Sequence, residues 1–327
     1  MAENEDSVGI TPEPYRKFGR AYTLYVKGRT AEHNIKYPLT CVFDINRQLY
    51  STANKGTFDL YGLSEDKRKD IYFDRTTVEE INTLISFKAG YMSQLPPDVT
   101  AGGGLDQQVT DLMMQRLPLA FIGGTTLAFT ERRGQEVITH IEAFDGGHAL
   151  AVATIGKAVR KGTAYVTAMH SVMDEMKQYG VERGEVKLSV VPDPFSSDDV
   201  LDGKCIEVLR RYAPKGAKVF VDNNRVHILG EGETLPTAGP QITLSAATGL
   251  IGTPKRFFRE VNCSMMFEPR VAIGQRVWLQ STLTPWINSL YKVQGVHHRG
   301  TISGASSDTA TTELSLYNLQ YDSRAKL

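Results

Sequence analysis

The stretch from Gln241 to Tyr321 decides the fold class. It begins QITLSAATGLIGTPKR, continues through YKVQGVHHRGTISG at 291–304, and closes with TTELSLYNL at 311–319. In the closing run Leu314 and Leu316 fall on one side of an extended chain, because successive side chains of a strand point to opposite faces. Short alternating runs interrupted by Gly, Pro, Asn and Asp are typical of compact antiparallel β-domains. This stretch predicts a small β-barrel domain without a reaction centre.

Composition and charge exclude several classes of protein. The chain has 327 residues, of which 41% are hydrophobic and 23% are charged, as in an ordinary globular protein of two or three domains. Lys plus Arg and Asp plus Glu both total 37, so the net charge of zero argues against general affinity for nucleic acid. No apolar run is long enough to span a bilayer, and the acidic N-terminus does not resemble a secretory signal.

Three cysteines indicate the redox environment. Cys41, Cys205 and Cys263 are far apart in the sequence and have apolar or small neighbours. This spacing fits neither a disulfide framework nor a set of metal ligands. We therefore expect reduced thiols in the core of a protein made in a cytoplasm.

The first part of the chain predicts a strand-rich domain with one short helix. Residues 1–17 are acidic and contain two prolines, which predicts a flexible arm. Alternation predicts three early strands: Ala21–Lys27, Leu39–Ile45 and Asn82–Gly90. Ser64 is the first residue of SEDKRKDIY and is placed to cap the helix that follows it. We predict that the first tube-like β-barrel domain covers residues 18–150.

A long irregular insertion interrupts this domain at residues 92–119. It contains the adjacent prolines Pro96 and Pro97 and three consecutive glycines, followed by an apolar patch. Long loops inside compact domains are usually functional. The patch suits contact with a partner protein, although packing against the flank of its own domain explains it slightly better. The apolar patch consists of Leu112, Met113, Met114 and Leu117.

The middle region changes to mixed α and β patterns. Helical spacing predicts helices over Thr163–Gly180, with Thr163 as the N-cap, and over Asp202–Ala213. The run VFVDNNRVHIL at 219–229 predicts a hairpin around an Asp-Asn-Asn turn. We therefore predict a small α+β domain over residues 151–239 and a second β-barrel domain over residues 240–327.

The sequence contains little that points to catalysis or metal binding. The usual phosphate-binding, zinc-protease and nucleophile motifs do not occur. His297 and His298 are adjacent on a predicted strand and must point to opposite faces. His140 and Glu142 share one side of a strand, but they form a metal site with Asp145 and His148 only if the fold gathers them. We predict no catalytic residue, no cofactor and no metal.

Two further groups of charged residues have ordinary explanations. Four aspartates between Asp193 and Asp202 could serve acid–base hydrolysis only as a pair held across a cleft. A solvated loop and the N-terminus of the following helix explain them better. Three basic doublets, Arg132-Arg133, Arg210-Arg211 and Lys255-Arg256, fit solvated faces or salt bridges between subunits better than nucleic-acid contacts.

Several phrases together resemble one family. They are FGRAYTLYV at 18–26, CVFDINRQLYSTANKGTFDLYGLS at 41–64, LISFKAGY at 84–91, ITLSAATGLIGTPKR at 242–256 and YKVQGVHHRGTISG at 291–304. In this order they resemble the Mu-type baseplate hub proteins of contractile-tailed phages. The resemblance extends from about Phe18 to Leu319, and it rests on strands and turns rather than on catalytic signatures.

The resemblance implies a structural role in the virion. It implies two tail-tube-like antiparallel β-barrels per subunit, joined by a smaller domain. It also implies that three subunits form a pseudo-sixfold ring that connects the tail tube to the central spike, beside other baseplate proteins. Phage DNA only passes through the lumen, assembly takes place in the host cytoplasm, and no membrane insertion is expected. A faint internal echo, FDLYGLS at 58–64 and LSLYNLQ at 314–320, fits a duplication.

One feature departs from the family, and two alternatives remain open. The insertion at 92–119 is longer than the family's connection, so we expect it to contact a neighbouring subunit or a baseplate protein. One alternative function is a hub-associated cell-wall hydrolase. The other is the hub of a bacterial contractile injection system.

Overall fold

A computed structural model describes residues 17, 19–50, 53–73, 84–92, 114, 116–236, 240–305 and 309–319. The protein is mainly β, as predicted, and its strands are mostly antiparallel. No helix in these ranges is long and apolar enough to cross a membrane.

The N-terminal part of the chain forms seven strands and the predicted short helix. They are β1 (Arg20–Lys27), β2 (Glu32–Lys36), β3 (Cys41–Gln48), β4 (Lys55–Tyr61), α1 (Glu65–Ile71), β5 (Leu84–Tyr91), β6 (Leu119–Arg133) and β7 (Glu136–Phe144). β1, β3 and β5 confirm the three predicted strands. Ser64 occupies the N-cap position of α1, but its side chain makes no capping hydrogen bond.

The middle part forms the predicted small α+β unit. Its elements are α3 (Gly147–Val152), β8 (Thr154–Val159), α4 (Tyr165–Glu175), η3 (Lys177–Tyr179), β9 (Glu182–Lys187), β10 (Asp199–Lys204), α5 (Cys205–Tyr212), β11 (Lys218–Asp222) and β12 (Arg225–Leu229). The β11–β12 hairpin confirms the prediction, and its turn residues Asn223 and Asn224 have φ of 52° and 56°. Asparagine tolerates this left-handed conformation, which a tight hairpin turn needs.

Two helix boundaries in this unit differ from the prediction. α4 begins after Ala164, so Thr163 is not its N-cap, whereas Gly180 ends the following turn at φ 85° as expected. The second helix begins at Cys205 rather than Asp202, because the preceding residues form β10 and pair with β8.

The C-terminal part forms six strands. Its elements are β13 (Ile242–Leu244), η4 (Ala246–Thr248), β14 (Leu250–Phe257), β15 (Glu260–Met266), β16 (Arg276–Leu279), η5 (Pro285–Ile287), β17 (Ser289–Ile302) and β18 (Thr309–Asn318). The burial of Leu314 and Leu316 confirms that they share the inner side of β18.

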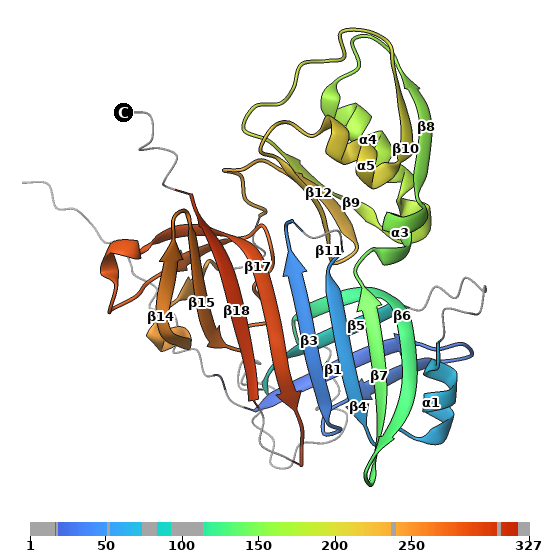
Figure 1. The fold of residues 1–327 in the computed structure, drawn as a ribbon, viewed down its shortest axis with the longest axis vertical. Coiled ribbons are helices and arrows are strands. Elements are labelled where there is room, and N and C mark those ends of the chain that lie inside the picture. The colour runs from blue at the N-terminus through green and yellow to red at the C-terminus, as the bar shows by residue number, and fades with distance from the viewer. Residues whose placement is uncertain are drawn as a thin grey trace, which may run out of the picture.

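One 13-stranded sheet joins the N-terminal and C-terminal parts (Figure 1). Its order is β14-β15-β18-β17-β3-β4-β7-β6-β5-β1-β2, and β16 and β13 branch from β17. The second half of β17 pairs with β3, from Gly295 opposite Gln48 to Ile302 opposite Cys41. The C-terminal strands therefore continue into the N-terminal sheet instead of closing on themselves. Among the described residues the strand order does not close on itself, so the two predicted β-barrels are not confirmed.

The sheet contains the same five-strand pattern twice. The first repeat comprises β3 to β7, and the second comprises β14 to β18. In both repeats the first two strands form a hairpin, the second strand pairs with the fifth, the third with the fourth, and the fourth with the fifth. The fourth strands share a register irregularity, between Thr125 and Leu127 in β6 and between Val293 and Gly295 in β17.

This repeat is not the echo that the sequence suggested. The phrase FDLYGLS begins on β4, the second strand of the first repeat, and LSLYNLQ begins on β18, the fifth strand of the second. The structural counterpart of β4 is β15. The two repeats share their strand topology, but their amino-acid sequences have little in common.

Three apolar clusters form the interior. One lies within the N-terminal strands around Phe58, Phe87 and Phe121, and it also takes in Phe267 and Ile302 from the C-terminal part. The second fills the α+β unit and the third fills the C-terminal strands. Because residues of both sheet halves share the first cluster, the predicted boundaries at 150 and 240 stay a prediction.

Candidate functional site

A polar face extends across both repeats. Four strands of each repeat lie side by side, and every second residue of each points away from the apolar interior. On β3, for example, Phe43 and Ile45 are buried, whereas Asp44, Asn46 and Gln48 are exposed. The polar face comprises Asp44, Asn46, Gln48, Lys55, Thr57, Asp59, His140, Glu142, Lys255, Asn262, Ser264, His297, Arg299, Glu313 and Ser315.

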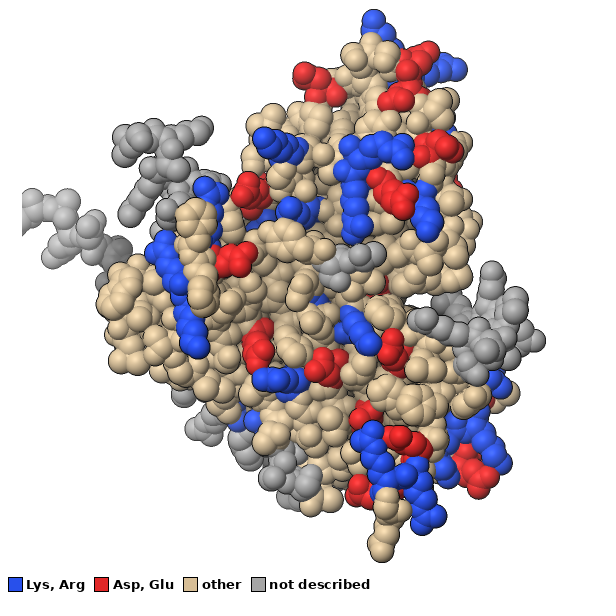
Figure 2. Space-filling model, viewed as in Figure 1, with Lys and Arg blue, Asp and Glu red and all other residues tan. Residues whose placement is uncertain are grey.

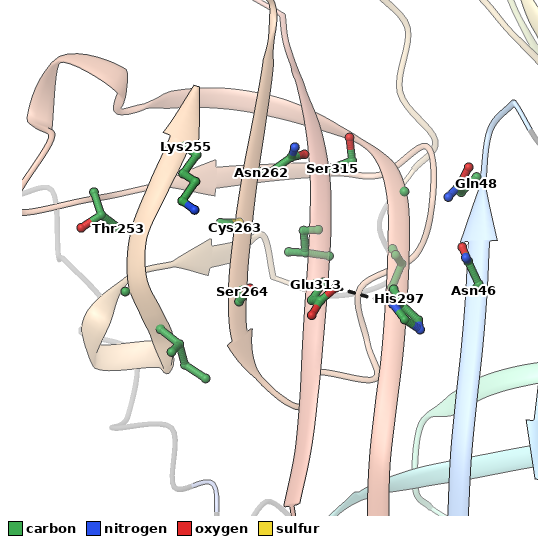
Figure 3. Close-up of a pocket in the computed structure, with 15 residues that line it drawn as sticks. Asn46, Gln48, Thr253, Lys255, Asn262, Cys263, Ser264, His297, Glu313 and Ser315 are labelled. Carbon is green, nitrogen blue, oxygen red and sulfur yellow. Dashed lines mark ion pairs between the residues drawn. The ribbon is translucent and has the colours of Figure 1, made fainter. Parts of the chain in front are cut away.

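The surface is hollowed where the two repeats meet. The hollow lies over β14, β15, β18, β17 and β3, and Figure 3 shows its lining side chains. His297 lies between Asp44 and Glu313, with Nε2 at 3.0 Å from Asp44 Oδ1 and Nδ1 at 3.6 Å from Glu313 Oε2. The lining is rich in amides, hydroxyls and charges, so the hollow is not an apolar pocket for a small molecule.

Charges on the polar face largely compensate each other. Arg299 pairs with Glu313 across β17 and β18, at 2.5 Å. In the first repeat Lys55 Nζ lies 3.0 Å from Glu142 Oε2. His140 Nδ1 lies 2.5 Å from Asp59 Oδ1.

Figure 2 shows the same surface from outside, with red and blue side chains interspersed over the middle of the sheet. Blue side chains gather over β14, at the left of the view. Lys255 lies there and makes no ion pair within the described part of the chain.

The pairing of β17 with β3 forms a seam between the two repeats. On the side of this seam opposite the polar face lies a buried charged cluster. Arg47 is 1% exposed, and its Nη1 lies 3.3 Å from Asp222 Oδ1 in the α+β unit. Its Nη2 donates to the Val271 carbonyl at 2.8 Å and lies 3.4 Å from Nε2 of buried His298. Burial, with Arg47 and His297 nearby, lowers the pKa of His298 well below its ordinary value, so this imidazole is neutral.

A second buried carboxylate holds the hairpin of the α+β unit. Asp145 follows β7 and accepts hydrogen bonds from the backbone N–H groups of Asn223 and Asn224, at 2.6 and 2.7 Å. Burial and the neighbouring Asp222 raise the pKa of Asp145 to about 7. Arg47, Asp145 and Asp222 thus fix the α+β unit to the sheet. The sequence offered one signal of this cluster, since Arg47 occupies an apolar position in the alternation of β3.

The predicted metal-ligand candidates do not converge. His140 and Glu142 share one side of β7, as predicted, but each pairs with a different partner on β4. Asp145 is buried beneath the hairpin turn, and the ring of His148 contacts Tyr179. His297 and His298 point to opposite sides of β17. No cluster of three metal-binding side chains occurs among the described residues.

Two aspartates of the loop at 193–202 accept hydrogen bonds within the α+β unit, and the three cysteines are buried. Asp198 accepts the backbone N–H of Lys161, and Asp199 accepts the hydroxyl of Tyr212. The predicted helix-capping role is wrong, because Lys204 occupies that position. Cys41, Cys205 and Cys263 are buried, and burial raises their pKa values, so they are protonated thiols.

The predicted partner-contact patch lies partly outside the described residues. Leu112 and Met113 are not described. Met114 and Leu117 are buried and pack with Ala21, Tyr37 and Met92. A contact of this segment with another protein stays a prediction.

The comparisons with known proteins identify the family. A family model described as baseplate hub gp41 matches residues 22–299. The chain belongs to the baseplate hub gp41 family. This places it among the structural proteins of phage baseplates and confirms the resemblance inferred from the sequence.

Solved structures agree in fold. A tail protein from Neisseria meningitidis MC58 has a TM-score of 0.54 and 12% identity, over 92% of this chain and 97% of its own. The 43 kDa tail protein of prophage MuSo2 from Shewanella oneidensis has a TM-score of 0.56 and 9% identity, over 91% of this hub chain and 98% of its own. No curated protein sequence matches.

Proposed function

We propose that this hub protein forms a trimeric ring with pseudo-sixfold symmetry that connects the tail tube to the central spike. The observation that carries the proposal is the internal repeat. Two similar sheet units per chain make six units in a threefold ring, so one end can match a sixfold tube and the other a threefold spike. Each repeat is then one tail-tube-like unit, as the family resemblance implied.

The polar face supports a structural role with a lumen. In the proposed ring this face lines the channel through which phage DNA passes. Duplex DNA binds proteins mainly through cations that neutralise its phosphates. A face whose cations are mostly paired with carboxylates offers few such contacts. The neighbouring carboxylates Asp145 and Asp222 are both buried rather than held across an open cleft, so we propose that the chain is not a hydrolase.

Mass photometry tests the ring. Across a range of concentrations, and with tail tube and spike proteins added, the proposal expects a species of three times the 36.2 kDa chain mass. A chain that stays monomeric alone and with both partners would contradict it.

Charge reversal tests the lumen. In the triple variant Asp44→Lys, Glu142→Lys and Glu313→Lys, cations replace paired carboxylates on the polar face. We expect duplex DNA to bind at least about 10-fold tighter at 50 mM salt, because each phosphate contact adds to the salt-dependent affinity. The control reverses Asp174, Glu182 and Glu207, which lie on the α+β unit and change the net charge equally. Equal affinity of the two variants would remove the argument for the polar face.

A further inference from the structure

The two repeats differ in what pairs with the second half of their fourth strand. In the second repeat this half of β17, Gly295–Ile302, pairs with β3. In the first repeat β5 pairs with β6 only up to Gly124, and beyond that point Phe73 bridges Ala128. From Phe129 to Arg133, β6 pairs only with β7 among the described strands. Among the described strands, this part of β6 therefore leaves one of its two edges unpaired.

The first strands of the repeats show the complementary difference. β3 pairs with β4 on one side and with β17 on the other. Its counterpart β14 pairs with β15 and with no other described strand, so it ends the sheet. β14 and β6 lie at opposite ends of the eight strands that the repeats contribute to the front of the molecule (Figure 1). The fourth strand of the second repeat thus pairs with the first strand of the first repeat, β17 with β3. The corresponding edges of β6 and β14 have no partner among the described strands of the same chain.

We propose that β14 of one copy pairs antiparallel with the second half of β6 of the next copy, in the register of the internal β17–β3 seam. This inference rests on the ring proposed above and names its subunit contact. A head-to-tail contact between two different edges forms a ring when the rotation from copy to copy closes, and the proposed trimer requires a rotation of this kind.

The register follows from counting across each repeat. A row of paired residues in the first repeat runs Asp44, Thr57, Glu142, Leu127. The equivalent row in the second, aligned on the shared irregularity, runs Lys255, Asn262, Ser315, Gly295. Lys255 therefore corresponds to Asp44, and Gly295 corresponds to Leu127.

The internal seam then predicts the external pairs. In the seam Asp44 lies opposite Arg299, four residues beyond Gly295. Four residues beyond Leu127 is Glu131, so Lys255 of one copy lies opposite Glu131 of the next. The same count places Phe257 opposite Phe129. In the internal seam the acid is on β3 and the base is on β17. In the predicted contact the base is on β14 and the acid is on β6.

The side chains suit these positions. Lys255 makes no ion pair with the described residues and lines the polar face. Among the described residues, Glu131 forms an ion pair only with Arg133 of its own strand, at a partly exposed position, and such a pair contributes little. Phe257 is 60% exposed. Packing against Phe129 of the next copy would remove this apolar ring from water. Opposite charges and aromatic pairs are favourable neighbours across antiparallel strands.

β14 also carries the features that protect a free edge from indiscriminate pairing. Its irregularity between Ile251 and Lys255 contains Pro254, which has no N–H to donate. Lysines, prolines and bulges on edge strands prevent aggregation of single chains. We expect the inter-subunit pairing to be short and to end at this irregularity.

Disulfide trapping tests the contact. The variant Glu131→Cys, Lys255→Cys is oxidised under conditions where the trimer is present, with tube and spike proteins if these are needed. The three native thiols are buried and stay in place. We expect covalent dimers and trimers. Each single variant alone should stay uncrosslinked, and a mixture of the two single variants should give dimers only.

Charge exchange provides a second readout that needs no disulfide. Glu131→Lys and Lys255→Glu each place like charges opposite one another, and each should raise the concentration at which the trimer dissociates by about 10-fold. The double exchange should restore the original value. A trimer that forms normally but shows neither the cross-link nor the restoration would overturn the contact and leave the ring intact. Failure to form any trimer would overturn both.

Discussion

The fourth strands of the two repeats, β6 and β17, pair with equivalent strands up to their shared irregularity. Beyond it, β17 gains β3 as a second partner, whereas β6 has no equivalent partner among the described strands. His298 of β17 is fully buried next to Arg47 in the charged cluster, whereas its counterpart Thr130 of β6 is exposed. The same topology thus gives a closed seam inside the chain and open edges at its ends. The pairing of β17 with β3 belongs to the fold of the single chain, whereas the unpaired edges would be explained by the ring proposed above.

The largest expected effect tests how differently the two repeats fill their interiors. Phe58 of β4 is fully buried against Phe87 and Phe121, and its counterpart on β15 is Cys263. Phe58→Ala leaves a large cavity and should lower the free energy of unfolding by about 3–5 kcal/mol. Cys263→Ala removes one atom and should cost only about 1 kcal/mol. Denaturant unfolding measures both losses, and equal losses would contradict this difference in packing between the repeats.

Breaking the buried side of the seam should have a nearly comparable effect. Arg47→Ala removes the cation beside Asp222 and the donor to the Val271 carbonyl. Losing one partner of a buried ion pair typically costs about 3–5 kcal/mol, because the other charge stays buried. The matched control is Arg299→Ala, an exposed residue on the same seam. If both variants lose the same stability, the cluster does not hold the seam.

The ends of the repeats should respond differently to pH. Asp145 follows the last strand of the first repeat, and the corresponding residue of the second is Asn318, which cannot titrate. Because the pKa of Asp145 is raised to about 7, the folded protein binds a proton that the unfolded chain has lost above about pH 4. This contribution is present at low pH and is lost as pH rises through 7.

Asp145→Asn removes this pH-dependent contribution. Asparagine keeps one acceptor for the hairpin turn and has no titration. Between pH 4 and pH 7 the wild type should therefore lose unfolding free energy relative to this variant. The loss should be about 1.4 kcal/mol for each step of one in pH, because only the folded state holds the proton in this range. Urea unfolding at several pH values measures it. A constant difference would show that Asp145 is not protonated in the folded protein.

The smallest effect is expected on the polar face. Glu313→Gln removes the partner of Arg299 and His297, but these side chains are solvent-accessible. Exposed ion pairs contribute little, so the melting temperature should change by about 2 °C or less. A large loss would mean that the polar face serves folding rather than the lumen.

The sequence predicted what depends on local pattern. Alternation located β1, β3, β5, β18 and the β11–β12 hairpin, because a half-buried strand alternates apolar and polar residues along its sequence. It missed β10, since Asp199–Lys204 has too few apolar residues to reveal an edge strand. The family phrases indicated two barrels, but the pairing of β17 with β3 joins residues about 250 positions apart and leaves no local signal. The polar face and the repeat became visible only with the sheet order.

The most direct test of the account is a cryo-electron microscopy reconstruction of the assembled hub without imposed symmetry. We predict three chains and six sheet units around one channel, with first and second repeats alternating and the polar face inward. We also predict that β14 of each chain meets β6 of the next. A ring with another number of units, or one in which only one repeat of each chain faces the channel, would contradict it.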